Sequence, residues 1–174
     1  MARKSDLDRI DFEILAALTR DARLSNKQLA AAVGLAPSSC LERIRSLRRR
    51  GVLRGAHADV DLPALGVALE ALLFVQLAKL DHAQVDRFVR RTAAVPEVRS
   101  VFLVSGPHDL VVHVAIPSME QLKQLISTRF NRNACVLRVE TSVIFDHHAH
   151  HALPVRPGSP DPLSSRTGRA AGRG

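Results

Sequence analysis

The spacing of the hydrophobic residues changes along this 174-residue chain, and the change restricts the folds that the chain can adopt. Up to about residue 50, apolar residues recur at the three- and four-residue spacing of amphipathic helices. From residue 71 onward, short apolar runs typical of strands alternate with two further helical segments. This order indicates an α+β protein built from a helical module and a mixed module.

The first module is expected to contain three helices. Ser5 or Asp6 is expected to cap the first helix. Its apolar face consists of Leu7, Ile10, Ile14, Leu15 and Leu18. Ser25 and Gln28 have the spacing of a capping box, so they predict the start of a second helix, and Gly34 predicts its end.

The third helix has an apolar side and a polar side. Pro37 suits its first turn, and Gly51 is expected to follow its last turn. The inward side consists of Cys40, Leu41, Ile44, Leu47 and the aliphatic stem of Arg48. The outward side consists of Ser38, Ser39, Glu42, Arg45, Ser46 and Arg49, with Arg43 and Arg50 at its borders. Two short helices joined by a glycine turn, the second of them basic, are typical of a helix-turn-helix.

A DNA-binding surface is therefore predicted on the third helix. Ser38 and Ser39, near its start, are expected to approach base edges or phosphates. We expect Arg43 to reach a base or a phosphate. The remaining candidates are Glu42, Arg45 and Arg49, of which the two arginines are expected to meet phosphates. The alternative is a plain three-helix bundle whose arginine-rich face is only solvated. Residues 52–61 alternate well enough to predict a short strand or wing.

The second module has the element order β-α-β-β-α-β. The expected strands are 71–77, 98–106, 109–116 and 136–145, and the expected helices are 82–95 and 118–130. This order predicts a ferredoxin-like sandwich, with both helices on one face of a four-stranded antiparallel sheet. Because the other face also carries apolar residues, we expect a second copy of the chain to cover it.

The charge is unevenly distributed along the chain. Residues 1–60 carry a net charge of +5, residues 61–153 are neutral, and residues 154–174 carry +3. The last segment is rich in Pro, Gly and Ser and is expected to be disordered. Neither a signal peptide nor a membrane-spanning stretch is recognisable, which predicts a cytoplasmic protein without membrane contact. The sequence also has no P-loop or dinucleotide-binding turn, so no cofactor is expected.

Three stretches together resemble the Lrp/AsnC, or feast/famine, family of prokaryotic transcriptional regulators. LDRIDFEILAALTRDARLSNKQLAAAVGLAPSSCLERIRSLRRRGVL is similar to its helix-turn-helix signature. AHADVDLPALG is similar to its connector strand, and PEVRSVFLVSGPHDLVVHVAI to the sheet of its effector domain. The chain departs from the family pattern at Leu110, where an aromatic residue is usual. It also departs at Ala36, where a capping Ser is common.

The resemblance implies a winged helix-turn-helix domain and an effector-sensing domain. The resulting boundaries are 1–55 for DNA binding, 56–68 for a connector, 69–153 for effector binding and dimerisation, and 154–174 for the tail. It implies double-stranded DNA as a partner, and homodimers that assemble into higher even-numbered oligomers such as octamers. It also implies an effector that is an amino acid or a related small molecule. The matching effector positions are Gly106, His108, Asp109, Thr141 and Ser142.

Two alternative functions would depend on the histidines of the chain. Siroheme decarboxylases are similar to this family in architecture, and such an enzyme would rely on His57, His108 and His113. A metal-sensing regulator would instead use a cluster near the C-terminus. That cluster comprises His147, His148, His150 and His151. The simpler interpretation of the cluster is an exposed run after the last strand, and no metal is expected.

Overall fold

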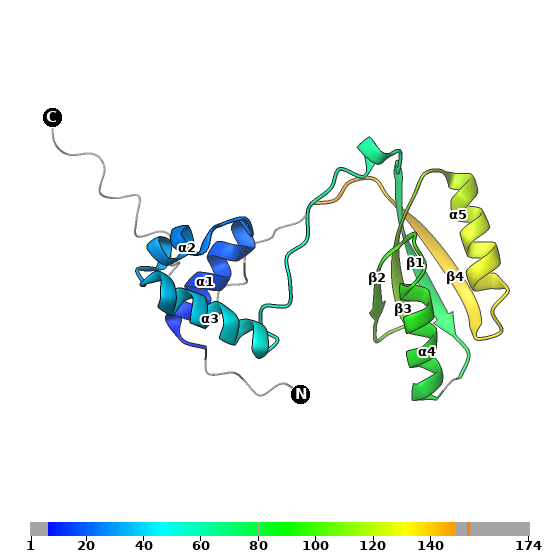
Figure 1. The fold of residues 1–174 in the computed structure, drawn as a ribbon. Helices are drawn as coiled ribbons and strands as arrows, with labels where there is room; N and C mark the ends of the chain where they lie inside the picture. The colour runs from blue at the N-terminus through cyan, green and yellow to red at the C-terminus, as the bar shows by residue number, and fades with distance from the viewer. Residues whose placement is uncertain (1–6, 80, 149–152, 154–174) are drawn as a thin grey trace. The chain divides into compact units, whose positions relative to one another are not determined.

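The computed structural model describes residues 7–79, 81–148 and 153. The described residues divide into two compact units, residues 7–58 and Asp59–His148 (Figure 1). Each unit buries its own set of apolar side chains, so each has its own hydrophobic core. Among the described residues, no helix combines the length and the apolar character that crossing a membrane requires.

The first unit consists of three helices, as predicted. They are α1 (Arg9–Arg20), α2 (Asn26–Val33) and α3 (Pro37–Arg49). Its buried apolar residues are Ile14, Leu29, Ala30, Val33, Cys40, Ile44 and Leu47. All of them except Ala30 occupy inward positions that the helical spacing indicates, so most of the core follows from the sequence pattern. The expected inward position of Arg48 was wrong, because this residue is exposed.

Most helix ends in this unit lie where the sequence predicts them. The Ser25–Gln28 capping box is formed, and Gly34 ends α2 with a φ of 71°. The backbone of Ala36 has N-cap geometry, but its side chain offers no cap to α3. The prediction for α1 was wrong, because its N-cap is Asp8, whose carboxylate accepts a hydrogen bond from the backbone N–H of Asp11 at 2.9 Å. Ser5 and Asp6 lie outside the described residues.

The strand expected over residues 52–61 is absent from the described structure. This segment has no regular secondary structure and pairs with no strand among the described residues. A strand requires a neighbour that satisfies its backbone N–H and C=O groups, and alternation alone does not supply one. All four strands of the described structure lie between Leu69 and Ile144.

The second unit is a four-stranded antiparallel sheet. Its strands are β1 (Leu69–Leu77), β2 (Val98–Leu103), β3 (Leu110–Ile116) and β4 (Val136–Ile144). Their order across the sheet is β2-β3-β1-β4. The helices are α4 (His82–Ala93) and α5 (Met119–Leu125), which continues into the π-helical segment η2 (Ile126–Asn131) (Figure 1). This topology is the predicted ferredoxin-like fold, so the expected fold class is confirmed.

Both helices cover the same face of the sheet. Phe88 of α4 and Leu122 of α5 belong to one buried cluster with alternate residues of the central strands, such as Leu73 and Val112. Because side chains alternate along a strand, the residues between these face the other side of the sheet, here called the open face. Its apolar members are Leu72, Phe74, Phe102 and Val111. None of these four side chains is fully buried within the chain.

Candidate DNA-binding surface and effector loop

The helix-turn-helix geometry is fixed by contacts between α2 and α3. Gly34 ends α2 in the left-handed conformation, which lets the chain turn at once toward Pro37. The side-chain amide of Asn26, in the first turn of α2, donates a hydrogen bond to the carbonyl oxygen of Pro37 at 2.8 Å. This bond links the starts of the two helices, so it holds the start of α3 in a defined position.

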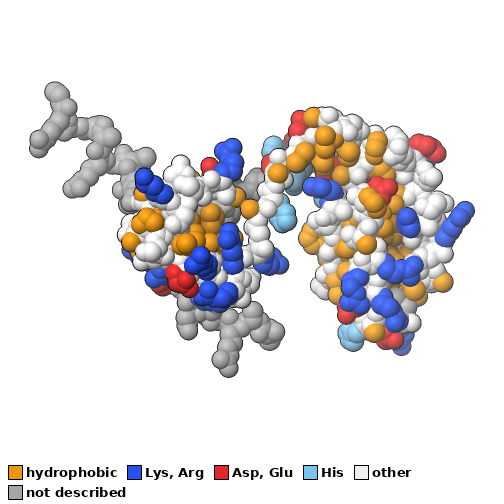
Figure 2. Space-filling view, in the orientation of Figure 1, with side chains coloured by type: hydrophobic (Ala, Val, Ile, Leu, Met, Phe, Trp, Pro, Cys, Tyr) orange, Lys and Arg blue, Asp and Glu red, His pale blue; other side chains and the backbone are white. Residues whose placement is uncertain are grey.

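The outward side of α3 is polar and accessible, as the sequence predicts. The exposed candidates are Ser38, Ser39, Glu42, Arg45 and Arg49. Figure 2 shows several Lys and Arg side chains gathered over this region, with acidic atoms beside them. Arg49 Nη2 lies 2.9 Å from Glu42 Oε1, and both side chains are well exposed. Exposed ion pairs are weak, so this contact leaves the Arg49 guanidinium free to exchange partners.

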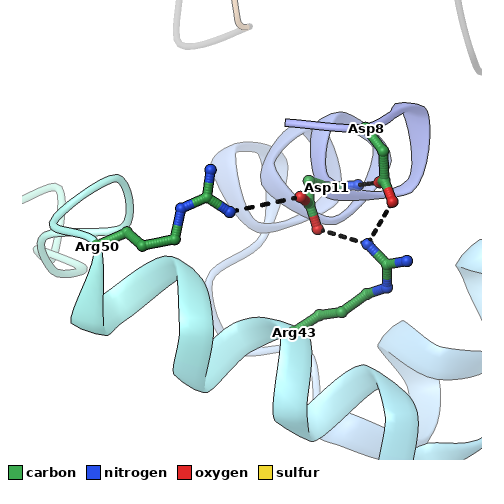
Figure 3. A network of polar contacts seen from close by, with 4 residues as sticks. All are labelled: Asp8, Asp11, Arg43 and Arg50. Atoms are coloured by element: carbon green, nitrogen blue, oxygen red, sulfur yellow. Dashed lines mark hydrogen bonds and ion pairs between the residues drawn. The ribbon is translucent and has the colours of Figure 1, made fainter. Parts of the chain in front are cut away.

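Arg43 lies differently from the other candidates. Its Nη1 donates hydrogen bonds to Asp8 Oδ2 at 2.7 Å and to Asp11 Oδ1 at 2.8 Å (Figure 3). Arg50 Nη1 lies 3.9 Å from the second oxygen of Asp11. Arg43 is expected from the sequence to reach a base or a phosphate, whereas in the structure its guanidinium is bound to Asp8 and Asp11 of α1.

The charges in this network stabilise one another. The pKa of Asp8 is lowered, mainly by the hydrogen bond from the Asp11 backbone N–H and also by the Arg43 guanidinium. Hydrogen bonds to Asp8 and Asp11 raise the pKa of Arg43 above its ordinary value. The contacts of Arg43 with Asp8 and Asp11 were not predicted from the sequence. A clue was available, because Asp11 occupies an inward position of α1 next to Ile10 and Ile14, where a charge requires a partner.

The β2–β3 turn contains the three main effector candidates. Gly106 is exposed and has a φ of 127°, a conformation that favours glycine. His108 is half-buried, with its ring centroid 5.4 Å from that of Phe74 and its Nε2 atom 3.5 Å from Glu140 Oε2. The side chain of His108 therefore lies on the open face of the sheet, beside β1 and β4.

Asp109 is bound to the backbone of β1. Its Oδ2 atom accepts a hydrogen bond from the Leu77 N–H at 2.7 Å, and its own N–H donates to the Val75 carbonyl at 3.0 Å. These contacts lie where the β1–β4 register shifts between Gln76 and Leu77. From the sequence, the partner of this carboxylate could be an effector ammonium group or the backbone of its own turn. Its partner is instead a neighbouring strand.

Thr141 and Ser142 lie on the other edge of the sheet. Both are exposed residues of β4, paired with Leu73 and Leu72 of β1 respectively. As consecutive residues of a strand they face opposite sides, so only Ser142 is on the open face. Because β1 lies between β3 and β4, the structure does not bring these two residues against the loop.

The histidines that the alternative functions require are dispersed. His108 and His113 are in the second unit, where His113 Nε2 lies 2.7 Å from Glu70 Oε2, whereas His57 belongs to the first unit. His148 Nε2 lies 3.1 Å from Asp146 Oδ2. His150 and His151 lie outside the described residues. Within the described ranges, no three His, Cys, Asp or Glu side chains form a group that could hold a metal ion.

Comparison with known proteins identifies both units. Residues 7–54 match the family model of a winged helix-turn-helix DNA-binding domain. Residues 70–153 match that of the Lrp/AsnC ligand-binding domain. The chain thus combines the two domains of a transcriptional regulator in the expected order.

Individual relatives agree with this match. The chain is 38% identical over 145 residues to the HTH-type transcriptional regulator AldR of Mycolicibacterium smegmatis, covering 83% of this chain and 85% of AldR. It is 36% identical over 144 residues to the leucine-responsive regulatory protein of Salmonella typhimurium, covering 81% and 86% of the two chains. A Neisseria meningitidis transcriptional regulator in complex with L-Met superposes with a TM-score of 0.78 and 28% identity, covering 85% of this chain and 96% of that chain.

The chain belongs to the Lrp/AsnC family of transcriptional regulators. It is a DNA-binding regulator, and the relatives named above are transcriptional regulators rather than enzymes. The family resemblance inferred from the sequence is therefore confirmed.

Proposed function

We propose that the exposed side of α3 recognises double-stranded DNA in the major groove. The observation that supports this is the solvent-facing polar side of α3, which directly follows the Gly34 turn. Ser38 and Ser39, in the first turn, approach base edges or phosphates. Arg45 and Arg49 bind phosphates. Glu42 accepts from a cytosine amino group or restrains Arg49.

The test is DNA binding by the full chain across a range of salt concentrations. The DNA is an operator obtained by in-vitro selection with the wild-type protein. Arg45→Gln and Arg49→Gln are each expected to weaken binding and to reduce the slope of log K against log salt by about 0.9 per lost phosphate contact. Arg23→Gln is the matched control, because it removes one positive charge from an exposed turn outside α3. Unchanged affinity and slope in both α3 variants would contradict the proposal that Arg45 and Arg49 bind phosphates.

The proposal assigns residues 1–55 to DNA binding, 56–68 to a connector, 69–153 to effector binding and dimerisation, and 154–174 to a basic tail. A second copy covers the open face, which carries Leu72, Phe74, Phe102 and Val111. Such a dimer places two α3 helices roughly 34 Å apart, as palindromic half-sites require. Dimers assemble further into even-numbered oligomers. Light scattering that shows a monomer at micromolar concentration contradicts this part of the proposal.

We also propose an amino acid as the effector. The ligand-binding family model over residues 70–153 and the relative in complex with L-Met support this. Gly106 offers an open backbone, since a Cβ built there meets nothing within 4 Å. His108 contributes its ring from the open face, and Asp109 shapes the loop. Of the two β4 candidates, only Ser142 shares the open face with His108, so Thr141 is left out of the proposed site. The function requires no catalysis and no cofactor, and it places the protein in the cytoplasm.

The effector is sought by a thermal-shift screen of the twenty amino acids. An amino acid that binds only the folded protein raises its melting temperature. His108→Ala is expected to reduce the shift caused by the active amino acid, and Met119→Ala, an exposed residue at the start of α5, is the control. If no amino acid stabilises the wild-type chain, the effector proposal is abandoned.

A further inference from the structure

A carboxylate is buried between α1 and α3. Asp11 occupies an inward position of α1, and its side chain is only 8% exposed. A buried carboxylate is costly unless it is paired and hydrogen-bonded. Asp11 meets this requirement with Arg43 of α3 at 2.8 Å and with Arg50, the C-cap of α3, at 3.9 Å.

The contact joins two functionally different parts of the unit. Arg43 Nη1 bridges Asp8 and Asp11, which are the N-cap and the first turn of α1 (Figure 3). Arg43 itself lies in the middle of α3, one residue from the exposed Glu42 and two from the exposed Arg45. The pair therefore fixes where the centre of α3 lies on α1. Removing Arg43 leaves the buried Asp11 carboxylate with only the 3.9 Å ion pair to Arg50, which is costlier than losing an exposed ion pair.

We propose that Asp11 and Arg43 are a positioning pair: they hold α3 at the angle that DNA binding requires, and Arg43 supports affinity without contacting DNA. The inference rests on the proposed function of α3. It assigns opposite roles to neighbouring arginines of one helix, since Arg45 and Arg49 bind phosphates and Arg43 binds α1.

Asp11→Asn distinguishes positioning from direct contact. This variant keeps every arginine and removes a negative charge from a DNA-binding module. If Arg43 were a phosphate ligand, releasing it from Asp11 would tighten DNA binding. If the pair positions α3, binding weakens, by roughly tenfold if the coupling is typical of contacting residues. Glu13→Gln is the matched control, because it removes a negative charge from the same helix, where the partner of Glu13 is Arg9.

Arg43→Gln provides the second measurement. We expect it to weaken binding about as much as Asp11→Asn, and the double variant to be no weaker than either single variant. The slope of log K against log salt is expected to stay at the wild-type value. Folding of each variant is checked by far-UV circular dichroism and thermal unfolding, and binding is measured below the lowest melting transition.

The outcomes separate the two proposals. A slope reduced by about 0.9 per lost phosphate contact in Arg43→Gln, or tighter binding by Asp11→Asn, shows that Arg43 is a DNA ligand and overturns the inference. Wild-type affinity in folded Asp11→Asn overturns it as well. An unchanged slope and affinity in Arg45→Gln and Arg49→Gln instead contradicts the proposed DNA-binding surface. If Arg43→Gln fails to fold, the opposite signs expected for Asp11→Asn still decide the question.

Discussion

Asp109 and Leu77 are joined by a hydrogen bond from the backbone N–H of Leu77 to the Asp109 carboxylate, 2.7 Å long. Leu77 is buried at the end of β1, where the β1–β4 register shifts and the regular ladder is interrupted. A side chain thus satisfies a buried backbone donor where the ladder is irregular. This contact links the β2–β3 turn to the central strand β1, so the shape of the proposed effector loop depends on it.

Asp109→Ala is expected to destabilise the protein. The variant leaves the Leu77 N–H without its acceptor, and a buried unsatisfied donor costs about 1–3 kcal/mol. The free energy of unfolding measured by urea denaturation should fall by that amount. Asp86→Ala, an exposed residue of α4, is the control and should change it little. An Asp109→Ala protein as stable as the wild type would show that Asp109 has no structural role.

The local features of the fold could be predicted from the sequence. The inward positions of α1 to α3, the Ser25–Gln28 box, the Gly34 turn and the β-α-β-β-α-β order all depend on residues near one another in the chain. Caps and periodicity are local interactions, so their residues carry the necessary information.

The contacts of the site could not be predicted in the same way. Asp109 and Leu77 are 32 residues apart, and Arg43 and Asp8 are 35 apart. Contacts between residues so far apart in the chain depend on how the helices and strands pack. The sequence pattern shows only that Arg43 borders the polar side of α3. The strand expected over residues 52–61 is absent for a related reason. A strand depends on a neighbouring strand as well as on the alternation of its own apolar and polar residues.

Ala36→Ser is expected to stabilise the protein. Ala36 already has the N-cap backbone, with φ −65° and ψ 144°, but its side chain makes no capping hydrogen bond to α3. A serine there can accept a hydrogen bond from the first turn, which is worth about 0.5–2 kcal/mol. The free energy of unfolding should rise accordingly. Ala31→Ser, at an exposed position inside α2, is the control and should lower stability slightly. No gain in Ala36→Ser would mean that the α3 start is satisfied in another way.

Asp8 makes the stability of the protein depend on pH. Its pKa is lowered in the folded state by the Asp11 N–H and by Arg43. The stabilisation is therefore fully present above the unfolded-state pKa of about 4 and is lost as the pH falls through the lower folded-state value. Asp8→Asn keeps a capping side chain but removes the charge. The difference in unfolding free energy between wild type and variant should be constant near neutral pH and should shrink below about pH 4. A difference that does not change with pH contradicts the role of the charge.

Phe102 and Leu103 test which face of the sheet forms the dimer. They are adjacent in β2, with side chains 52% and 65% exposed, so neither is needed for the core. Phe102 pairs with Val111 on the open face, whereas Leu103 pairs with Leu110 and points to the helix-covered side.

If a second copy covers the open face, Phe102→Lys buries an unpaired charge in the interface, while Leu103→Lys leaves the charge in solvent. We expect the dimer dissociation constant to rise at least ~10-fold in Phe102→Lys and to stay near the wild-type value in Leu103→Lys, measured by sedimentation. Because the two variants change the same strand by the same charge, equal effects would mean that the open face is not the interface. A larger effect of Leu103→Lys would assign the contact to the opposite side of β2.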